Sequence, residues 1–368
     1  MKIVLTGGCT GGHIYPALAI GDKFREKQED VEIIFIAHQY GLETTIVPKA
    51  GYDLHIVTAE WFDRSNPLRL IKTLLATNKG RKEAYKVIKE FKPDVVVSTG
   101  SFVSVPVVLA AKKYGASIYI QEQNAFPGLS NKLLEGCAKN IFLGFEGGRE
   151  QFRDQSKLIY SGNPVRAEFC GRDQKKDREE LGIPADDTVI MLFGGSLGSE
   201  ELNRIGVEIA RKYANQKGLT FIFGTGNDYY ADVMEILKKE GLDCCENIRP
   251  LAYIDGMPRT LSAADVIIGR AGALSVAEIT MSGRAAIFVP SPNVTADHQY
   301  YNAKAVADNG GAFIVRESEN TVSEVIEKLD ELVSDRELIE KMGKASFEIA
   351  PVNATDIIYD KIMETYGR

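Results

Sequence analysis

The chain has 368 residues, of which 44% are hydrophobic and 26% are charged, and its formal net charge is −7. This length suffices for two globular domains, each with its own hydrophobic core, and the excess of acidic residues excludes a general nucleic-acid binder. The five cysteines show no metal-ligand spacing, so the sequence predicts a reduced, cytosolic chain without a metal centre. The longest apolar stretch, residues 103–111, is too short to span a bilayer. We therefore expect any membrane contact to be peripheral.

Short runs rich in valine and isoleucine alternate with helical patterns through most of the sequence. The runs of the first half are residues 2–6, 32–36, 94–98, 117–121 and 140–143, and those of the second half are residues 188–193, 220–223, 265–268, 285–289 and 312–315. Nearly continuous apolar strands separated by helices are typical of parallel sheets covered on both faces. We therefore predict an α/β fold with two doubly wound domains, a linker at residues 161–164 and a final helix over residues 356–366.

A glycine-rich turn, residues 7–12, follows the first predicted strand and opens a helix. Glycines let a ligand approach the backbone, and this is the position where open α/β sheets bind ligands. A nicotinamide dinucleotide fold is disfavoured, because its fingerprint needs glycine in place of Cys9 and an acid where the second strand ends in His38. His13, at the start of the helix, is a candidate general base. The alternative is a histidine that only caps and packs.

Two further turns of this kind lie in the second half. Residues 194–199 follow a strand, and Ser196 can donate hydrogen bonds to an anion. Residues 265–278 form a strand end, a turn and a helix from Ala273, whose unpaired N–H groups suit a phosphate. Glu278, one and a half turns further, can accept hydrogen bonds from a vicinal diol such as ribose. The alternative is that all three turns are ordinary strand–turn–helix corners, with Glu278 on the surface.

Further polar side chains lie after predicted strands or the linker, as expected of a binding cleft. They are Glu122, Asn124, Asn131, Arg166 and Gln299. None has metal-ligand spacing, so the charge on a leaving diphosphate would be met by helix ends and Arg166 rather than by a cation.

Six motifs complete the pattern. They are Gly-Gly-x-Thr-Gly-Gly-His-Ile-Tyr-Pro-Ala-Leu-Ala at 7–19, Glu-Gln-Asn at 122–124, Gly-Asn-Pro-Val-Arg at 162–166, Gly-Gly-Ser-Leu-Gly at 194–198, Arg-Ala-Gly-Ala-x-x-x-Ala-Glu at 270–278 and Asp-His-Gln-x-x-Asn-Ala at 297–303. With these motifs, in this order over nearly the whole length, the chain resembles the MurG family, the N-acetylglucosaminyltransferases of bacterial peptidoglycan synthesis.

The resemblance implies a GT-B fold, in which two Rossmann-like domains enclose the active cleft. It implies a hexosyltransferase without a cofactor that moves N-acetylglucosamine, with inversion, from UDP-N-acetylglucosamine to the muramyl 4-hydroxyl of undecaprenyl-linked lipid I, giving lipid II. Residues 1–162 would form the acceptor and membrane-side domain, and residues 163–353 the donor domain. Residues 354–368 would form a helix that packs back on the first domain.

The resemblance also implies roles for single residues. On the donor side, Ile254 would meet the uracil, Glu278 the ribose and Gln299 the sugar, while Ser196 and Arg166 would meet the diphosphate. The phosphate-facing helix start would consist of Ala273, Leu274, Ser275, Val276 and Ala277. The acceptor or the transferred sugar would meet Thr10, Gly11, Gly12, Asn124 and Asn131. His13 is the candidate base, with Glu122 as its partner.

The sequence departs from the family pattern at four places. Cys9, Ser101, Gln121 and residues 283–285 stand where the family more often has Gly, Gly, His and Gly-x-Pro. These departures affect turn stiffness and the acceptor side rather than the donor side. The alternatives are another GT-B transferase with a different lipid or sugar acceptor, a nucleotide-sugar epimerase and a non-catalytic sugar-nucleotide-binding module. An epimerase would change the free nucleotide sugar without an acceptor, and a binding module would turn nothing over.

Residues 61–92 contain nine basic and three acidic residues, a local charge of +6 in an acidic chain. Their apolar residues gather on one helical face or just upstream of it: Leu68, Ile71, Leu74 and Leu75, with Trp61 and Phe62. Apolar residues ringed by lysine and arginine are typical of a surface that rests on anionic lipid. The alternative is a core-facing helix with a solvated basic side. With the family resemblance, we expect peripheral contact with the cytoplasmic face of the cell membrane.

Overall fold

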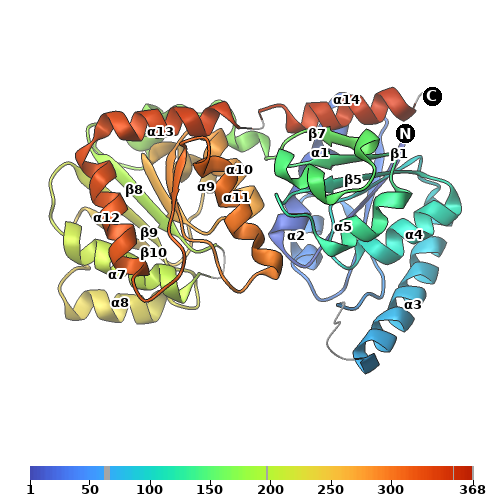
Figure 1. Cartoon of the computed structure of the whole chain (residues 1–368), viewed down its shortest axis with the longest axis horizontal. Coiled ribbons are helices and arrows are strands. Elements are labelled where there is room, and N and C mark those ends of the chain that lie inside the picture. Colours follow the sequence, from blue (N-terminus) through green and yellow to red (C-terminus); the bar gives the residue numbers. More distant parts are fainter. Residues whose placement is uncertain (62–66, 196–197, 351, 367–368) are drawn as a thin grey trace. The chain divides into compact units, whose positions relative to one another are not determined.

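The computed structural model of the chain describes residues 1–61, 67–195, 198–350 and 352–366. The chain divides into two units: unit 1 consists of Met1–Arg166 and Pro351–Arg368, and unit 2 consists of Ala167–Ala350. Each unit contains a parallel sheet with helices on both faces (Figure 1). This is the predicted architecture of two Rossmann-like, doubly wound domains, because parallel neighbours are joined by helical crossovers.

Unit 1 begins with a regular alternation of strands and helices. Its strands are β1 (Lys2–Thr6), β2 (Glu32–Ala37), β3 (Asp53–Ile56), β4 (Val95–Ser98), β5 (Ser117–Glu122), β6 (Asn140–Leu143) and β7 (Leu158–Tyr160). Its α-helices are α1 (Gly11–Lys27), α2 (Glu43–Lys49), α3 (Pro67–Phe91), α4 (Ser104–Tyr114), α5 (Leu129–Leu134) and, from the end of the chain, α14 (Ala354–Tyr366). Its 3-10 helices are η1 (Glu135–Cys137), η2 (Glu146–Gln151) and η3 (Gln155–Lys157).

The strands of unit 1 lie in the order β3-β2-β1-β4-β5-β6-β7. Neighbouring residues of β1 point to opposite faces, as the pleat requires. Ile3 and Leu5 pack in one core cluster with α1 and α14, while Val4 packs in another with α3 and α4. The helix α14 joins the first cluster through Ile358 and Ile362, which are fully buried. The last helix of the chain therefore belongs to the same core as the first.

Unit 2 repeats this plan. Its strands are β8 (Thr188–Phe193), β9 (Leu219–Gly224), β10 (Ile248–Leu251), β11 (Val266–Gly269), β12 (Ala285–Phe288) and β13 (Ala312–Ile314). Its α-helices are α6 (Gln174–Glu180), α7 (Glu200–Tyr213), α8 (Tyr230–Lys239), α9 (Met257–Ala263), α10 (Ala273–Met281), α11 (His298–Ala307), α12 (Thr321–Ser334) and α13 (Arg336–Glu348). Two short 3-10 helices are η4 (Ala167–Phe169) and η5 (Thr295–Asp297).

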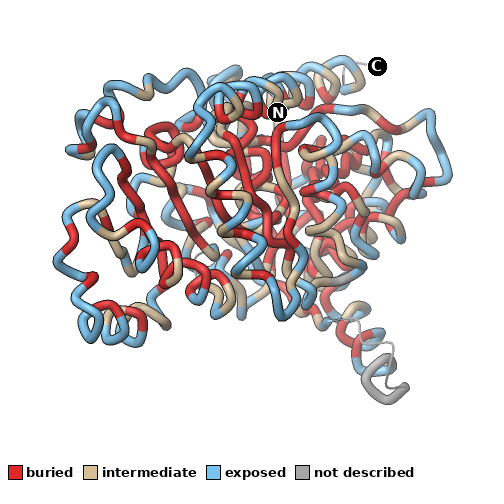
Figure 2. The backbone as a smooth tube through the Cα atoms, turned by 60° about the vertical axis from the view of Figure 1, so that its left-hand side comes forward, coloured by how far each residue is buried: buried red, intermediate tan, exposed pale blue. Residues whose placement is uncertain are grey.

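The strands of unit 2 lie in the order β10-β9-β8-β11-β12-β13. A large core cluster on one face of this sheet includes buried residues of α7, α12 and α13, such as Ile205, Leu329 and Met342. Figure 2 shows the strands buried along most of their length and the outer sides of the helices exposed. Because the strands are buried, the ligand-accessible backbone of each unit lies at the strand ends.

Candidate functional site

Each sheet has one point where the order of its strands reverses. β1 lies between β2 and β4, and β8 lies between β9 and β11. The loops after β1 and β4, and those after β8 and β11, are therefore neighbours at the carboxyl ends of the strands, where open α/β sheets bind ligands. The three predicted glycine-rich turns follow β1, β8 and β11. The sequence motifs thus lie at the two switch points.

A buried carboxylate holds the turn after β1. Glu43, the first residue of α2, is fully buried, and its Oε2 accepts the N–H of Cys9 at 2.9 Å. Cys9 and Ser101 both have a φ of 70°, and the Ser101 hydroxyl donates to Cys9 Sγ at 3.3 Å. A left-handed backbone favours glycine, so the side chains at both positions strain this turn. Burial raises the pKa of the Cys9 thiol, which is therefore a neutral part of the turn. The acceptor-side residues predicted here lie at the start of α1: Thr10, Gly11 and Gly12.

The candidate base, His13, lies in the first turn of α1. Its Nδ1 is 2.8 Å from the carbonyl oxygen of Thr99 and 3.0 Å from Oε1 of Gln123. Both are acceptors, since the amide nitrogen of Gln123 itself donates to Thr99 O at 2.8 Å and to Gln121 O at 3.0 Å. In the neutral imidazole Nδ1 then carries the proton, assigned from this network. Nε2 keeps its lone pair, as a general base requires.

Glu122, the last residue of β5, has its hydrogen bonds in its own loop rather than with His13. Its Oε1 accepts the backbone and side-chain N–H groups of Asn124 at 2.9 and 3.2 Å, and its Oε2 accepts the N–H of Gly128 at 2.9 Å and Nδ2 of Asn131 at 2.8 Å. In this structure, the described hydrogen bonds of Glu122 therefore do not include the expected one to His13. Four donors already occupy this carboxylate, which is 1% exposed. Glu122 positions the two asparagines.

Gly100 allows His13 and Asn131 to approach each other. It has a φ of 97°, and a Cβ at this position would lie 3.3 Å from both the His13 ring and Asn131 Nδ2. The Oδ1 of Asn131 is buried and has no hydrogen-bond partner among the described residues. The first switch point therefore brings His13, Asn131 and the Glu122 loop together.

Arg270 links the loops at the second switch point. Its Nη2 donates to Oγ of Ser199 at 2.7 Å, and its Nη1 donates to the carbonyl oxygen of Val289 at 3.0 Å and pairs with Glu317. The loops after β8, β11 and β12 are thereby fixed to one guanidinium. Neither Arg270 nor Gln123 is among the residues predicted for the site. The sequence does contain a signal that could have identified both, because each is a strongly polar side chain directly after a buried strand.

The helix α10 begins at Ala273, as predicted, and its N-cap residue is Gly272, which makes no side-chain cap. Leu274 and Ser275 are half-buried there, whereas Val276 and Ala277 are buried. Glu278 is also half-buried and lies about one and a half turns from the start of the helix. The start of α10 therefore offers backbone N–H groups and its positive dipole end at the switch point of unit 2.

Two more predicted donor residues lie in unit 2. Ile254 follows β10 and is buried, and its Cδ1 would lie 2.7 Å from a Cβ placed on Gly224. Gln299 lies in the first turn of α11, and its Oε1 accepts the N–H of Ser291 at 2.9 Å, which ties α11 to the loop after β12. Both side chains therefore contact neighbouring strand-end loops.

Ser196 and Arg166 are the two residues predicted to bind the diphosphate. Ser196 lies outside the described residues. Arg166 belongs to unit 1, which extends beyond the predicted boundary at residue 162, and its guanidinium carbon lies 5.0 Å from the centre of the Tyr15 ring. Asn163 lies beyond the predicted boundary but is tied to unit 1, because its Nδ2 donates to the carbonyl oxygen of Gln123 at 2.9 Å. In the described part of the chain, no group of three or more His, Cys, Asp or Glu side chains could hold a metal ion.

The N-terminal half of α3 carries exposed apolar side chains. Ile71, Leu74 and Leu75 are 55%, 59% and 67% exposed, and Trp61, just upstream, is 66% exposed. The predicted residues Phe62 and Leu68 lie where side chains are not described. These exposures oppose a core-facing N-terminal half, whereas Ala84 and Ile88 in the C-terminal half of α3 are buried in the core. Within the described ranges, the chain contains no helix with the length and apolarity needed to cross a membrane.

Comparisons with known proteins agree with this geometry. The glycosyltransferase family 28 N-terminal domain matches residues 3–143, and the C-terminal domain of the same family matches residues 189–357. The UDP-N-acetylglucosamine–N-acetylmuramyl-(pentapeptide) pyrophosphoryl-undecaprenol N-acetylglucosamine transferase of Caldicellulosiruptor saccharolyticus is 37% identical over 366 residues, which cover 100% of this chain and 98% of the relative.

Two solved structures are also similar. MurG of Acinetobacter baumannii has a TM-score of 0.77 and 26% identity, with 99% of both chains covered. The UDP-GlcNAc 2-epimerase of Neisseria meningitidis, solved with UDP-GlcNAc, has a TM-score of 0.69 and 16% identity, with 99% of this chain and 100% of that chain covered. At this identity the epimerase shares the fold alone.

Proposed function

Because this chain belongs to the family of UDP-N-acetylglucosamine–N-acetylmuramyl-(pentapeptide) pyrophosphoryl-undecaprenol N-acetylglucosamine transferases, we propose that it converts lipid I into lipid II. The enzyme transfers N-acetylglucosamine from UDP-N-acetylglucosamine to the muramyl 4-hydroxyl of undecaprenyl-linked lipid I, with inversion. The observation that carries this proposal is the 37% identity over the whole chain. The glycine-rich turns at both switch points support it.

Unit 2 binds the nucleotide of the donor in this proposal. The start of α10, residues 273–277, meets the phosphates through backbone N–H groups and the helix dipole. Glu278, on the same helix, accepts hydrogen bonds from the ribose hydroxyls, and the backbone of Ile254 meets the uracil. A carboxylate that accepts two hydroxyls favours ribose over deoxyribose, because the missing partner leaves a polar group unpaired.

The diphosphate and the transferred sugar meet other residues. Ser196 and Arg166 take the diphosphate, and Gln299 takes the sugar. The hydrogen bonds of Arg270 to Ser199 and Val289 support a positioning role, since they fix the loops that carry these contacts. A fixed set of donors stabilises charge that develops on a leaving group without reorganising during the reaction.

Unit 1 binds the acceptor and supplies the base. Residues 10–12, Asn124 and Asn131 meet the acceptor or the transferred sugar. Nε2 of His13 takes the proton of the 4-hydroxyl as that oxygen attacks the anomeric carbon. The bond between the anomeric carbon and the diphosphate breaks, and UDP leaves with the electron pair. The hydrogen bonds of Nδ1 support this role, because they leave Nε2 able to accept a proton.

The acceptor lipid brings the enzyme to an anionic membrane surface in this proposal. The exposed side chains of Ile71, Leu74, Leu75 and Trp61 support peripheral contact through residues 61–92. Each basic residue near such a surface contributes about 1 kcal/mol, which salt screens.

The membrane contact is tested by co-sedimentation with vesicles that contain anionic lipid. Binding should fall with added salt and when Arg69, Lys72 and Arg81 are changed together to glutamate, since the local charge of residues 61–92 falls from +6 to zero. A matched control changes three basic residues of unit 2, Lys239, Lys304 and Lys328, to glutamate. Equal pelleting of the wild type and the α3 variant, with both folded, would place the membrane surface elsewhere.

The proposed reaction is tested by mixing the purified chain with labelled UDP-N-acetylglucosamine and a lipid I analogue. Label should enter the lipid only when both substrates are present. An epimerase would instead change the free nucleotide sugar without the lipid, and a binding module would leave both unchanged. Either of those outcomes contradicts the proposal.

A further inference from the structure

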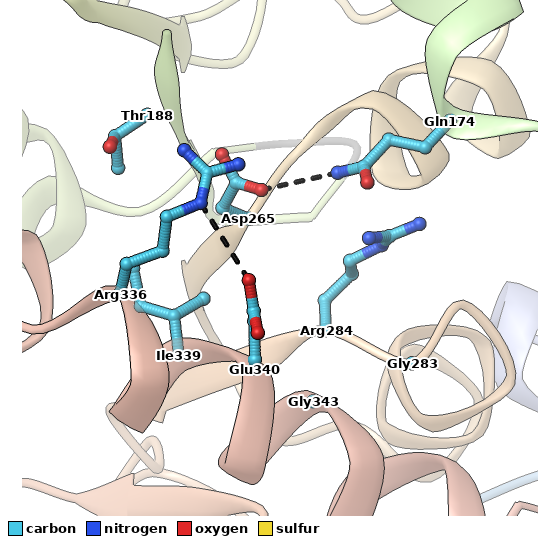
Figure 3. A pocket seen from close by; sticks show the side chains of 9 residues that line it. All are labelled: Gln174, Thr188, Asp265, Gly283, Arg284, Arg336, Ile339, Glu340 and Gly343. Carbon is cyan, nitrogen blue, oxygen red and sulfur yellow. Dashed lines mark hydrogen bonds and ion pairs between the residues drawn. The ribbon is translucent and has the colours of Figure 1, made fainter. Parts of the chain in front are cut away.

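Unit 2 contains a cavity of about 240 Å³ away from the glycine-rich turns (Figure 3). Its walls include Thr188, the first residue of β8, Asp265, which precedes β11, and Arg284, which precedes β12. These are the amino-terminal ends of parallel strands, so the cavity lies at the edge of the sheet opposite the switch-point loops. The helix α13 closes it with Arg336 and Glu340.

Arg284 has no partner at this cavity. Its Nε is buried, and among the described residues its guanidinium makes no hydrogen bond or ion pair. Asp265 lies near it but is already occupied: its Oδ2 accepts from Arg178 at 2.6 Å and from the N–H of Val189 at 2.8 Å, and its Oδ1 accepts from Gln174 at 3.2 Å. Burial lowers the pKa of Arg284, and the nearby charges of Asp265 and Asp177, which act in the opposite direction, do not offset it.

The charges around the cavity do not balance. Arg178 neutralises Asp265 at 2.6 Å, Arg172 neutralises Asp177 at 2.9 Å, and Arg336 pairs with Glu340 at 3.7 Å. Arg284 therefore remains as an extra positive charge within the described surroundings. An unpaired cation removed from water is costly, whereas a guanidinium suits an oxyanion because it presents several N–H groups in one plane.

We propose that this cavity binds a small phosphate-type oxyanion, held by Arg284 together with Arg336 and the hydroxyl of Thr188. In Figure 3, Arg284 and Arg336 lie on opposite sides of the cavity, with Glu340 between them. Arg336 and Glu340 are 61% and 72% exposed, so their contact is weak and Arg336 can turn to the anion. The hydroxyl of Thr188 has no hydrogen-bond partner among the described residues.

The bound anion joins α13 to the strands of unit 2. Arg336 is the first residue of α13, whereas Thr188 and Arg284 belong to the beginnings of β8 and β12. A ligand that bridges these elements binds only the folded unit. It therefore stabilises that unit by mass action.

The test is the thermal midpoint of the full chain in inorganic phosphate and in chloride of equal ionic strength. Saturating UDP is present in both, so that phosphate does not act through the loops after β8 and β11. The wild type should gain roughly 3–6 °C at a phosphate concentration about ten times the dissociation constant. Arg284→Gln should lose this gain, and Arg336→Gln should reduce it. Arg204→Gln, which removes an exposed arginine of α7, should respond like the wild type.

Stability without phosphate separates binding from a merely structural role. Arg284→Gln should be at least as stable as the wild type in chloride, because it removes a charge without a partner. A lower midpoint of this variant in both buffers would make Arg284 a structural residue and overturn the proposal. An equal phosphate gain in Arg284→Gln would also overturn it, as would no gain in the wild type. A response to succinate but not to phosphate would contradict the proposed ligand class.

Discussion

Replacing Glu122 by alanine tests how the first switch point is built. The Glu122 carboxylate accepts four hydrogen bonds from the loop that it precedes. A buried donor left without an acceptor costs about 1–3 kcal/mol, and a hydrogen bond to a charged group contributes about 1.5–3 kcal/mol. Asn131 is buried, whereas Asn124 and Gly128 can bond to water instead. The free energy of unfolding of Glu122→Ala should therefore fall by about 3 kcal/mol.

The assay combines urea unfolding with steady-state kinetics. Because Glu122 positions Asn124 and Asn131, the KM for the acceptor should rise while the affinity for UDP-N-acetylglucosamine is unchanged. Glu135→Ala is a matched control: Oε1 of Glu135 accepts the N–H groups of Arg153 and Asp154, each at 2.7 Å, in the same unit. This control should lose stability without a change in acceptor KM. A Glu122→Ala variant with wild-type stability and acceptor KM would refute the positioning role.

Three further predictions concern the two units separately. Glu278→Ala should raise the dissociation constant of UDP-N-acetylglucosamine at least about tenfold, a loss of about 1.4 kcal/mol, and reduce the preference for ribose over deoxyribose; an unchanged constant in calorimetry would contradict the ribose assignment. His13→Ala should lower turnover by about 10²–10⁴ with donor affinity unchanged; near-normal turnover would exclude His13 as the base. Burial alone would raise the pKa of Asp177, but the hydrogen bonds from Arg172 outweigh it and hold that pKa below its usual range. A lowered pKa in the folded state stabilises the protein above the unfolded value of about 3.9, and this contribution is lost as the pH falls through the folded pKa. Asp177→Asn should therefore be less stable than the wild type at pH 7, and the difference measured by urea unfolding should shrink below about pH 4; a difference independent of pH would argue against this ion pair.

The strand predictions succeeded for every central strand and for the edge strand β13, and the strands they missed all lie at sheet edges. All ten predicted strands are present, but β3, β7 and β10 were not predicted. Each of these three is the outermost strand of its sheet. Edge strands are shorter and partly exposed, so they lack the continuous apolar run that identifies a strand buried on both faces. In β10, Pro250 further weakens the strand pattern.

The motifs located both switch points, but not the hydrogen bonds within them. The positions of His13 and Glu122 follow from their places after strand ends, which the sequence gives directly. The hydrogen-bond partner of His13 does not follow from the sequence, because the choice between Glu122 and Gln123 depends on which of these side chains faces α1. Glu43 was missed for a related reason: it lies in a separate helix and reaches Cys9 only in the folded unit.

The most direct test of the proposed chemistry is the anomeric configuration of the disaccharide that the enzyme makes from UDP-N-acetylglucosamine and a lipid I analogue. The sugar of the donor is α-linked to its diphosphate. A single direct displacement, in which the 4-hydroxyl loses its proton to His13 as it attacks, inverts the anomeric carbon. The proton coupling at this carbon, measured by nuclear magnetic resonance, should therefore report a β-linked N-acetylglucosamine. An α-linked product would contradict direct displacement with His13 as the base.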